Sequence, residues 1–179
     1  MATANPFVIL SLAALLAGIT VSAPALADTP QANCAPDKPI LPDDLHGWAS
    51  PTHLAAADTV SALDHAILLP GQAVLAALRP TPDVSYALRP DDRGGTVSSG
   101  GMMVFNAPRA GTYRIMLDAR AWLDVVRDGA SIGSTHHGRG PACSGIGKMV
   151  DFPLPAGRAI VQISGSPKPE IEIMVIPVP

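Results

Sequence analysis

The sequence has few charged residues and no run of basic ones. Its 12 lysines and arginines are scattered among 15 acidic residues, and the formal net charge is −3. Proteins that bind nucleic acids usually carry a basic patch or stripe that faces the phosphates. The scattered pattern therefore disfavours a nucleic acid as the partner.

Long apolar runs are missing after residue 27. Residues 7–18 are almost wholly apolar, but a run of this length is typical of a signal-peptide core rather than of a membrane span. Ala25-Leu26-Ala27 then supplies the small-x-small pattern that precedes cleavage. We predict a signal peptide over residues 1–27 and no membrane segment in the mature chain. An uncleaved anchor stays open as the alternative, because residues 1–6 contain no lysine or arginine.

Cysteine is scarce, with only Cys34 and Cys143 in the chain. In an oxidising compartment, two cysteines most simply form one disulfide. Closing so long a loop stabilises a fold by about 4–5 kcal/mol in the chain-entropy treatment. The alternative is one catalytic thiol and one spare. Export and a disulfide together predict a periplasmic or secreted protein.

Motifs of common catalytic classes are also missing. Ser144 lies between Cys143 and Gly145, outside any Gly-x-Ser-x-Gly turn of a serine hydrolase. The glycines of residues 94–101 are followed by no lysine and open no helix, so they indicate a turn rather than a phosphate loop. Carboxylate pairs for glycoside hydrolysis stay open, because spacing alone does not separate them from solvated turn acids. The candidate acids are Asp118, Asp124, Asp128 and Asp151.

Proline and glycine, by contrast, are abundant, with 19 and 16 residues. Prolines recur through residues 28–51, where they block helices and remove ladder donors. We predict an extended arm there, pinned to the body through Cys34 and meeting the core near Leu45-His46-Gly47-Trp48. Residues 52–179 are predicted to form one domain. It begins with a short helix or loop and a strand near residues 65–69.

Beyond residue 70, short β-type segments alternate with turn residues at regular spacing. Apolar and polar residues alternate within them, which is typical of antiparallel sheets buried on one face. We predict an all-β, antiparallel, jelly-roll-like β-sandwich of about nine short strands. They are residues 72–79, 84–89, 100–106, 112–117, 121–127, 130–135, 149–154, 159–164 and 171–176.

The segment over residues 105–129 has the clearest pattern, and we predict that its two strands form a hairpin. In such a hairpin Trp122 and Asp124 face outward, near Arg114 and Asp118 on the neighbouring strand. An exposed tryptophan beside carboxylates and an arginine is typical of a sugar-binding face, where the ring packs on C–H groups and the charged groups bond hydroxyls. The alternative is that another segment covers Trp122 and makes it part of the core.

A polar, glycine-rich loop over residues 136–147 begins with His136 and His137. A metal site would use both histidines, together with Asp124 or Asp151. However, adjacent residues of an extended backbone point to opposite faces, and the spaced ligand motifs of strong metal sites are missing. A surface loop fixed by the disulfide is therefore the favoured interpretation.

Two short segments resemble secreted β-sandwich modules. Gly111-Thr112-Tyr113-Arg114 is similar to the first residues of a strand in carbohydrate-binding and prepeptidase C-terminal-type domains. Val125-Val126-Arg127-Asp128-Gly129 resembles a hairpin of the same domains. This resemblance implies a β-sandwich and specifies no ligand.

A longer resemblance is to a family of short exported bacterial proteins. Its members are sometimes labelled homogentisate 1,2-dioxygenase, an enzyme that holds iron with two histidines and a glutamate. Under that label the resemblance implies a metal-dependent enzyme that uses the His136–His137 loop, with iron or another divalent metal as its cofactor. No iron ligand set is carried over residue by residue. The matching segments are Leu45-His46-Gly47-Trp48, Pro70-Gly71-Gln72-Ala73-Val74, Ala121-Trp122-Leu123-Asp124-Val125-Val126 and His137-Gly138-Arg139-Gly140-Pro141-Ala142-Cys143-Ser144-Gly145-Ile146.

The favoured hypothesis is an exported, non-catalytic β-sandwich domain that needs no cofactor and binds a glycan, an envelope polymer or a protein partner. The predicted ligand-binding residues are Trp122, Asp124, Arg114 and Asp118. A metal-dependent enzyme using His136 and His137 is the alternative. A third hypothesis is an accessory or structural envelope protein whose surface serves a single partner.

Overall fold

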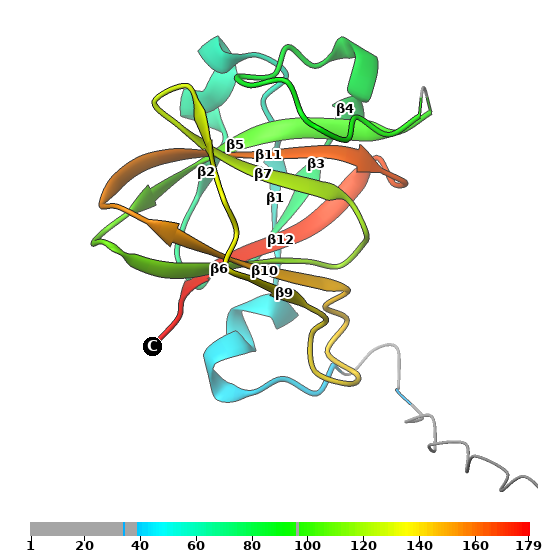
Figure 1. Ribbon diagram of the computed structural model, residues 1–179. Coiled ribbons are helices and arrows are strands. Elements are labelled where there is room, and N and C mark those ends of the chain that lie inside the picture. The colour runs from blue at the N-terminus through cyan, green and yellow to red at the C-terminus, as the bar shows by residue number, and fades with distance from the viewer. Residues whose placement is uncertain (1–33, 35–38, 96) are drawn as a thin grey trace, which may run out of the picture. The chain divides into compact units, whose positions relative to one another are not determined.

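The computed structural model describes residue 34, residues 39–95 and residues 97–179 (Figure 1). The predicted signal peptide and most of the predicted arm lie outside these residues. All the described residues belong to one compact unit, Ala32–Pro179. The described elements are the 3-10 helices η1 (Asp43–Ala49), η2 (Val60–His65) and η3 (Thr81–Asp83) and the strands β1 (Thr52–Ala55), β2 (Ile67–Leu68), β3 (Val74–Ala77), β4 (Arg79–Pro80), β5 (Ser99–Ala107), β6 (Gly111–Leu117), β7 (Trp122–Arg127), β8 (Ala130–Ile132), β9 (His136–Gly138), β10 (Lys148–Leu154), β11 (Gly157–Ser166) and β12 (Glu170–Pro177).

The strands form two layers, which confirms the prediction of an all-β sandwich (Figure 1). The first sheet, here sheet A, has the order β1-β3-β12-β6-β10-β9. The second, sheet B, has the order β2-β5-β11-β7-β8, and β4 also pairs with β5. Pairings between the described strands are antiparallel except β1–β3 and β2–β5.

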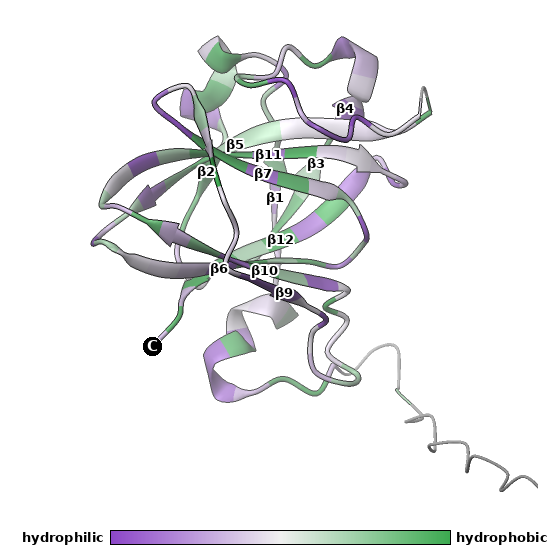
Figure 2. Ribbon diagram, viewed as in Figure 1, coloured by the Kyte–Doolittle hydropathy of each residue, from purple (hydrophilic) through white to green (hydrophobic). Residues whose placement is uncertain are grey.

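Alternate residues of the long strands build the core between the sheets. Tyr113 pairs with Phe152 and Ile115 with Val150, and all four side chains are buried. The ring of Phe105, from sheet B, meets the ring of Tyr113 edge-on, with centroids 5.1 Å apart. Figure 2 shows hydrophobic residues along β5, β7, β11 and β12. The residues predicted to point inward from β6, β7, β10, β11 and β12 all belong to the core cluster, so the predicted period-2 pattern is confirmed for these strands.

A second apolar cluster lies on the outer face of sheet A, where η1 covers it. Leu45 and Trp48 of η1 are buried against Met116, Met174 and Ile176. Cys34 forms the predicted disulfide with Cys143, with the Cα atoms 5.1 Å apart. The backbone passes so close that a Cβ atom at position 47 would overlap the carbonyl oxygen of Gly71, which explains the glycine there. The prediction that residues 45–48 meet the core is confirmed.

The predicted hairpin of the segment 105–129 is wrong. β6 pairs with β12 and β10 in sheet A, whereas β7 pairs with β11 and β8 in sheet B. Residues 118–121 therefore cross from one sheet to the other. They lack the two-residue turn sequence of a tight hairpin. That sequence is Asp128-Gly129, with φ of 51° and 77°, and it joins β7 to β8.

The strand predicted at residues 84–89 is also wrong, because this stretch is a loop. The backbone of Leu88, in the middle of this loop, bonds a side chain instead of a neighbouring strand. The Leu88 N–H donates to Gln162 Oε1 at 3.0 Å, and the Leu88 carbonyl accepts from Gln162 Nε2 at 3.0 Å. The predicted loop over residues 136–147, in turn, contains the short strand β9.

Candidate functional site

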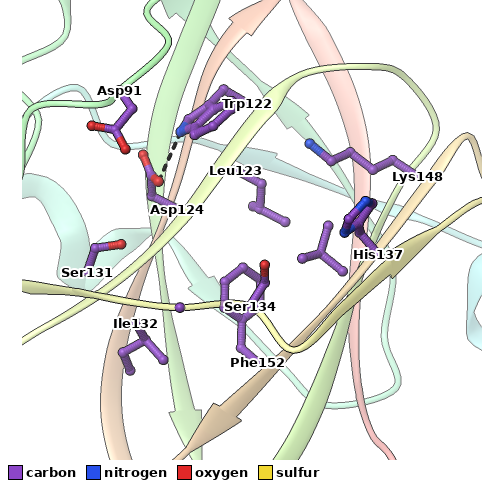
Figure 3. A pocket seen from close by; sticks show the side chains of 12 residues that line it. Asp91, Trp122, Leu123, Asp124, Ser131, Ile132, Ser134, His137, Lys148 and Phe152 are labelled. Carbon is purple, nitrogen blue, oxygen red and sulfur yellow. Dashed lines mark hydrogen bonds between the residues drawn. The ribbon is translucent and has the colours of Figure 1, made fainter.

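A cavity of about 410 Å³ opens at the side of the sandwich, where sheets A and B separate. One wall comes from β7 and β8 and the other from β9 and β10 (Figure 3). The cavity is lined by Asp91, Trp122, Leu123, Asp124, Ser131, Ile132, Gly133, Ser134, His137, Lys148, Val150 and Phe152.

The cavity exists because β8 is shorter than the strand that it borders. β8 pairs only with Val125–Arg127, the second half of β7. After Ile132 the chain leaves sheet B and joins sheet A, where the Thr135 N–H donates to the Asp151 carbonyl at 2.8 Å. The first half of β7 therefore borders a gap between the sheets, and Trp122 and Asp124 lie at its rim.

Trp122 and Asp124 form one side of the cavity. Trp122 keeps 37% of its surface exposed, and its indole Nε1 donates to Asp124 Oδ1 at 2.9 Å (Figure 3). Burial raises the pKa of Asp124, the Trp122 hydrogen bond opposes that shift, and the charge of Asp91 adds to it. The face of the Trp122 indole and the second carboxylate oxygen of Asp124 are thus available to a ligand at the rim of the cavity.

Lys148 and His137 lie across the cavity from this pair (Figure 3). The Lys148 ammonium donates to the Ala121 carbonyl at 2.6 Å, which leaves two of its three N–H groups for other acceptors. Burial lowers the pKa of Lys148, and the negative charge of Asp124 opposes that shift. The cavity therefore has an acidic side beside the indole and a basic side opposite it.

Arg114 lies elsewhere, on the outer face of sheet A. Its guanidinium forms a two-pronged ion pair with Asp151, with Nε–Oδ1 at 2.7 Å and Nη2–Oδ2 at 2.8 Å. The Asp151 side chain is only 7% exposed. The hydrogen bonds from Arg114 lower the pKa of Asp151, and the same bonds raise the pKa of Arg114. This pair braces β6 against β10 and is not part of the cavity.

Asp118 lies at a third place, where the chain leaves β6. One of its oxygens accepts from Lys168 Nζ at 2.5 Å and the other accepts from the Glu172 N–H at 3.1 Å. Burial, followed by the charge of Asp118, raises the pKa of Glu172 to about 7. Both acids line a separate hollow under the disulfide, next to Trp48. The four predicted ligand-binding residues thus divide into Trp122 with Asp124, Arg114 alone and Asp118 alone.

The two histidines do not share a site. His137 pairs with Val150 in the ladder and lines the cavity, whereas His136 pairs with Asp151, whose side chain belongs to the outer face. Within the part of the chain that the structure describes, no three His, Cys, Asp or Glu side chains lie close enough to hold a metal ion. The donor set therefore does not fit an iron centre with two histidines and a carboxylate.

Sequence reasoning missed Asp91 and Lys148. Asp91 comes from the loop before β5 and Lys148 begins β10, so neither is near Trp122 in the sequence. No local motif could have placed them together, because their approach depends on how the two sheets stack. Asp91 had the appearance of an ordinary turn acid and Lys148 that of a residue flanking a strand.

Comparison with known proteins identified no relative of this chain. No family model matches the chain, and no curated protein matches it. The chain is an all-β sandwich of two sheets, with a disulfide and a lateral cavity. Its function must therefore be argued from the cavity.

Proposed function

We propose that this protein is an exported, non-catalytic β-sandwich domain that binds a glycan in the cavity beside Trp122. The observation that carries the proposal is a partly exposed indole at the rim of a cavity, hydrogen-bonded to a carboxylate that also faces it. The volume of about 410 Å³ lies within the range of about 300–1,000 Å³ that is usual for small-molecule sites.

The chemistry of the lining suits a sugar. The apolar C–H face of a pyranose ring packs against an indole, and its hydroxyls require both donors and acceptors. Asp91 and Asp124 supply acceptors, and Lys148 supplies donors from the opposite wall. Leu123 and Phe152 close the floor with apolar surface. This mixture favours an amphipathic ring over a purely apolar ligand.

Export is supported by two observations. The N-terminal sequence predicts a signal peptide, the structure contains the Cys34–Cys143 disulfide, and such bonds persist in oxidising compartments. Among the described residues, no helix has the length and apolar character to cross a membrane. An exported binding domain of this kind would meet glycans of the cell envelope or its surroundings.

A non-catalytic role is supported by the state of the one serine beside the cysteine. Ser144 is 1% exposed, and its hydroxyl donates to the Pro141 carbonyl at 2.7 Å and accepts from the Ile146 N–H at 3.1 Å. These bonds brace the loop that carries the disulfide, and they engage the Ser144 hydroxyl both as a donor and as an acceptor. Ser144 is thus a structural residue and not a nucleophile.

The test is a glycan screen with the mature protein, followed by titration of the best binder. We expect Trp122→Ala to weaken binding by about fivefold or more, because stacking of a ring on an aromatic side chain contributes about 1 kcal/mol or more. Leu69→Ala, which truncates an exposed apolar residue outside the cavity, is the matched control and should change nothing. Binding that survives both Trp122→Ala and Asp124→Asn would eliminate this cavity as the site.

A further inference from the structure

Another hollow, of about 380 Å³, shares two lining residues, His137 and Lys148, with the cavity beside Trp122. Its remaining lining residues are Arg120, Ala121, Gly138, Arg139 and Gly147. Three basic side chains, those of Arg120, Arg139 and Lys148, thus line one hollow that contains no acidic residue. We call it the cationic hollow.

The fold brings these cations together from three separate segments. Arg120 lies in the crossing between β6 and β7, Arg139 directly follows β9, and Lys148 begins β10. Lys148 is paired in register with Leu117, at the end of β6, and the Gly147 N–H donates to the Leu117 carbonyl at 2.8 Å. Met149 pairs with Gly138, next to Arg139. Strand register therefore fixes the cluster, although the basic residues are scattered along the sequence.

The charges of the cationic hollow are not matched by ion pairs. Within the described part of the chain, the lysines and arginines in ion pairs are Arg114, Arg127, Arg158 and Lys168. Arg120 and Arg139 are exposed, and Lys148 spends one N–H group on the Ala121 carbonyl. Three neighbouring cations repel one another, and an anion placed among them relieves that repulsion. In a chain of net charge −3, this local excess of positive charge favours an anionic ligand.

The hollow lies next to the proposed sugar site, because Lys148 and His137 line both. A ring stacked on Trp122 therefore has carboxylates on its near side and, on its far side, Lys148, which also lines the cationic hollow. Arginine presents paired N–H groups that match carboxylate, sulfate and phosphate oxygens. Such geometry favours a substituent with two or more charged oxygens over a hydroxyl.

We infer that the ligand is an acidic glycan, whose ring packs on Trp122 and whose anionic group lies in the hollow between Arg120, Arg139 and Lys148. The inference rests on the proposed function, because it concerns the same ligand. The anionic group is a carboxylate of a uronic acid, a sulfate ester or a phosphate ester, which share this recognition chemistry.

The experiment compares matched glycan pairs on the mature protein. One pair is an oligogalacturonate and its methyl ester, and others are sulfated and phosphorylated oligosaccharides with their unsubstituted forms. We expect the acidic member of at least one pair to bind about tenfold or more tightly than its neutral partner, as a charge-assisted hydrogen bond would provide. The preference should shrink as salt is raised. The pair with the largest preference identifies the anionic group.

Variants then locate the effect. The double variant Arg120→Gln, Arg139→Gln should reduce the acidic preference about tenfold and leave binding of the neutral member unchanged. Arg109→Gln removes one charge from an exposed arginine at the opposite end of β6 and should leave both affinities unchanged. All substituted residues are exposed, so equal melting temperatures are expected and verify folding.

The outcomes separate the two proposals. Equal affinity for acidic and neutral members, with binding still lost in Trp122→Ala, overturns the acidic specificity and leaves the glycan site standing. An acidic preference that persists in the double variant also overturns the role of the cationic hollow. Failure of every acidic and neutral probe to bind overturns both proposals.

Discussion

The two tryptophans of this chain lie in contrasting surroundings. Trp48 is 3% exposed and belongs to the cluster that η1 forms on the outer face of sheet A, beneath the disulfide. Trp122 is 37% exposed and stands at the rim of the lateral cavity, hydrogen-bonded to Asp124. One tryptophan thus attaches η1 to sheet A, whereas the other is partly exposed to solvent. The proposed function rests on this difference, because an indole at the rim of a cavity can pack against a ligand and a buried indole cannot.

The largest expected effect is on stability, from Trp48→Ala. Removing a fully buried tryptophan should lower the free energy of unfolding by about 3–5 kcal/mol, because it opens a cavity between η1 and sheet A. Chemical denaturation monitored by circular dichroism measures this loss. A loss below about 1 kcal/mol would show that the second cluster contributes little.

The second largest loss of stability is expected when the disulfide is removed. Cys34→Ser with Cys143→Ser should lower the free energy of unfolding by about 2–5 kcal/mol, since the bond joins residues that are 109 positions apart in the sequence. Denaturation of the variant beside the parent protein gives the value. The pairing itself is checked by intact mass after alkylation without reductant, and two alkylated cysteines would contradict it.

Glu172, which lines the hollow beside Trp48, should make the free energy of unfolding depend on pH. Its pKa is raised from 4.5 to about 7, so folding opposes its ionisation. The contribution of Glu172 to the free energy of unfolding is therefore fully present below about pH 4.5, and it is lost as the pH rises through about 7 and the carboxyl ionises. Because the side chain is only partly buried, we expect about 1–2 kcal/mol rather than the full linkage value.

Glu172→Gln should remove this part of the pH dependence. Melting temperatures across pH 4 to 8 provide the measurement, and Glu170→Gln, an exposed acid on the same strand, is the control. The prediction fails if the parent protein and Glu172→Gln show the same pH profile.

The smallest effect on stability is expected for Trp122→Ala. An exposed side chain that makes one hydrogen bond should contribute no more than about 1 kcal/mol to folding. Denaturation alongside Trp48→Ala provides a direct comparison of the two tryptophans. A loss as large as that of Trp48→Ala would place Trp122 in the core and remove the argument for a binding role.

Local patterns in the sequence predicted the inner faces of the strands and the disulfide. The alternation of Tyr113 and Ile115 with Arg114 is visible within a single strand, so no knowledge of neighbours is required. Residues 118–121 carry no turn sequence that selects a hairpin, and a short link between two alternating strands can also cross between sheets. Choosing the hairpin placed Arg114 beside Trp122, whereas the crossing places them on different sheets.

The basic side of the site could not be predicted for a related reason. Arg120, Arg139 and Lys148 come together only through the register of β6, β10 and β9. Register depends on pairing between distant segments, and no spacing within one segment encodes it. Asp91 likewise reaches the cavity from a loop that packs on sheet B. The sequence therefore indicated half of the site, Trp122 with Asp124, and concealed the half that faces it.

Tryptophan fluorescence tests the central claim most directly, because each tryptophan can be observed alone. Trp48→Phe leaves Trp122 as the reporter, and Trp122→Phe leaves Trp48. We predict that the best-binding acidic glycan shields Trp122 from a soluble quencher in the first variant and leaves the emission of Trp48 unchanged in the second. Quenching of Trp122 that is the same with and without a saturating, bound glycan would contradict the account.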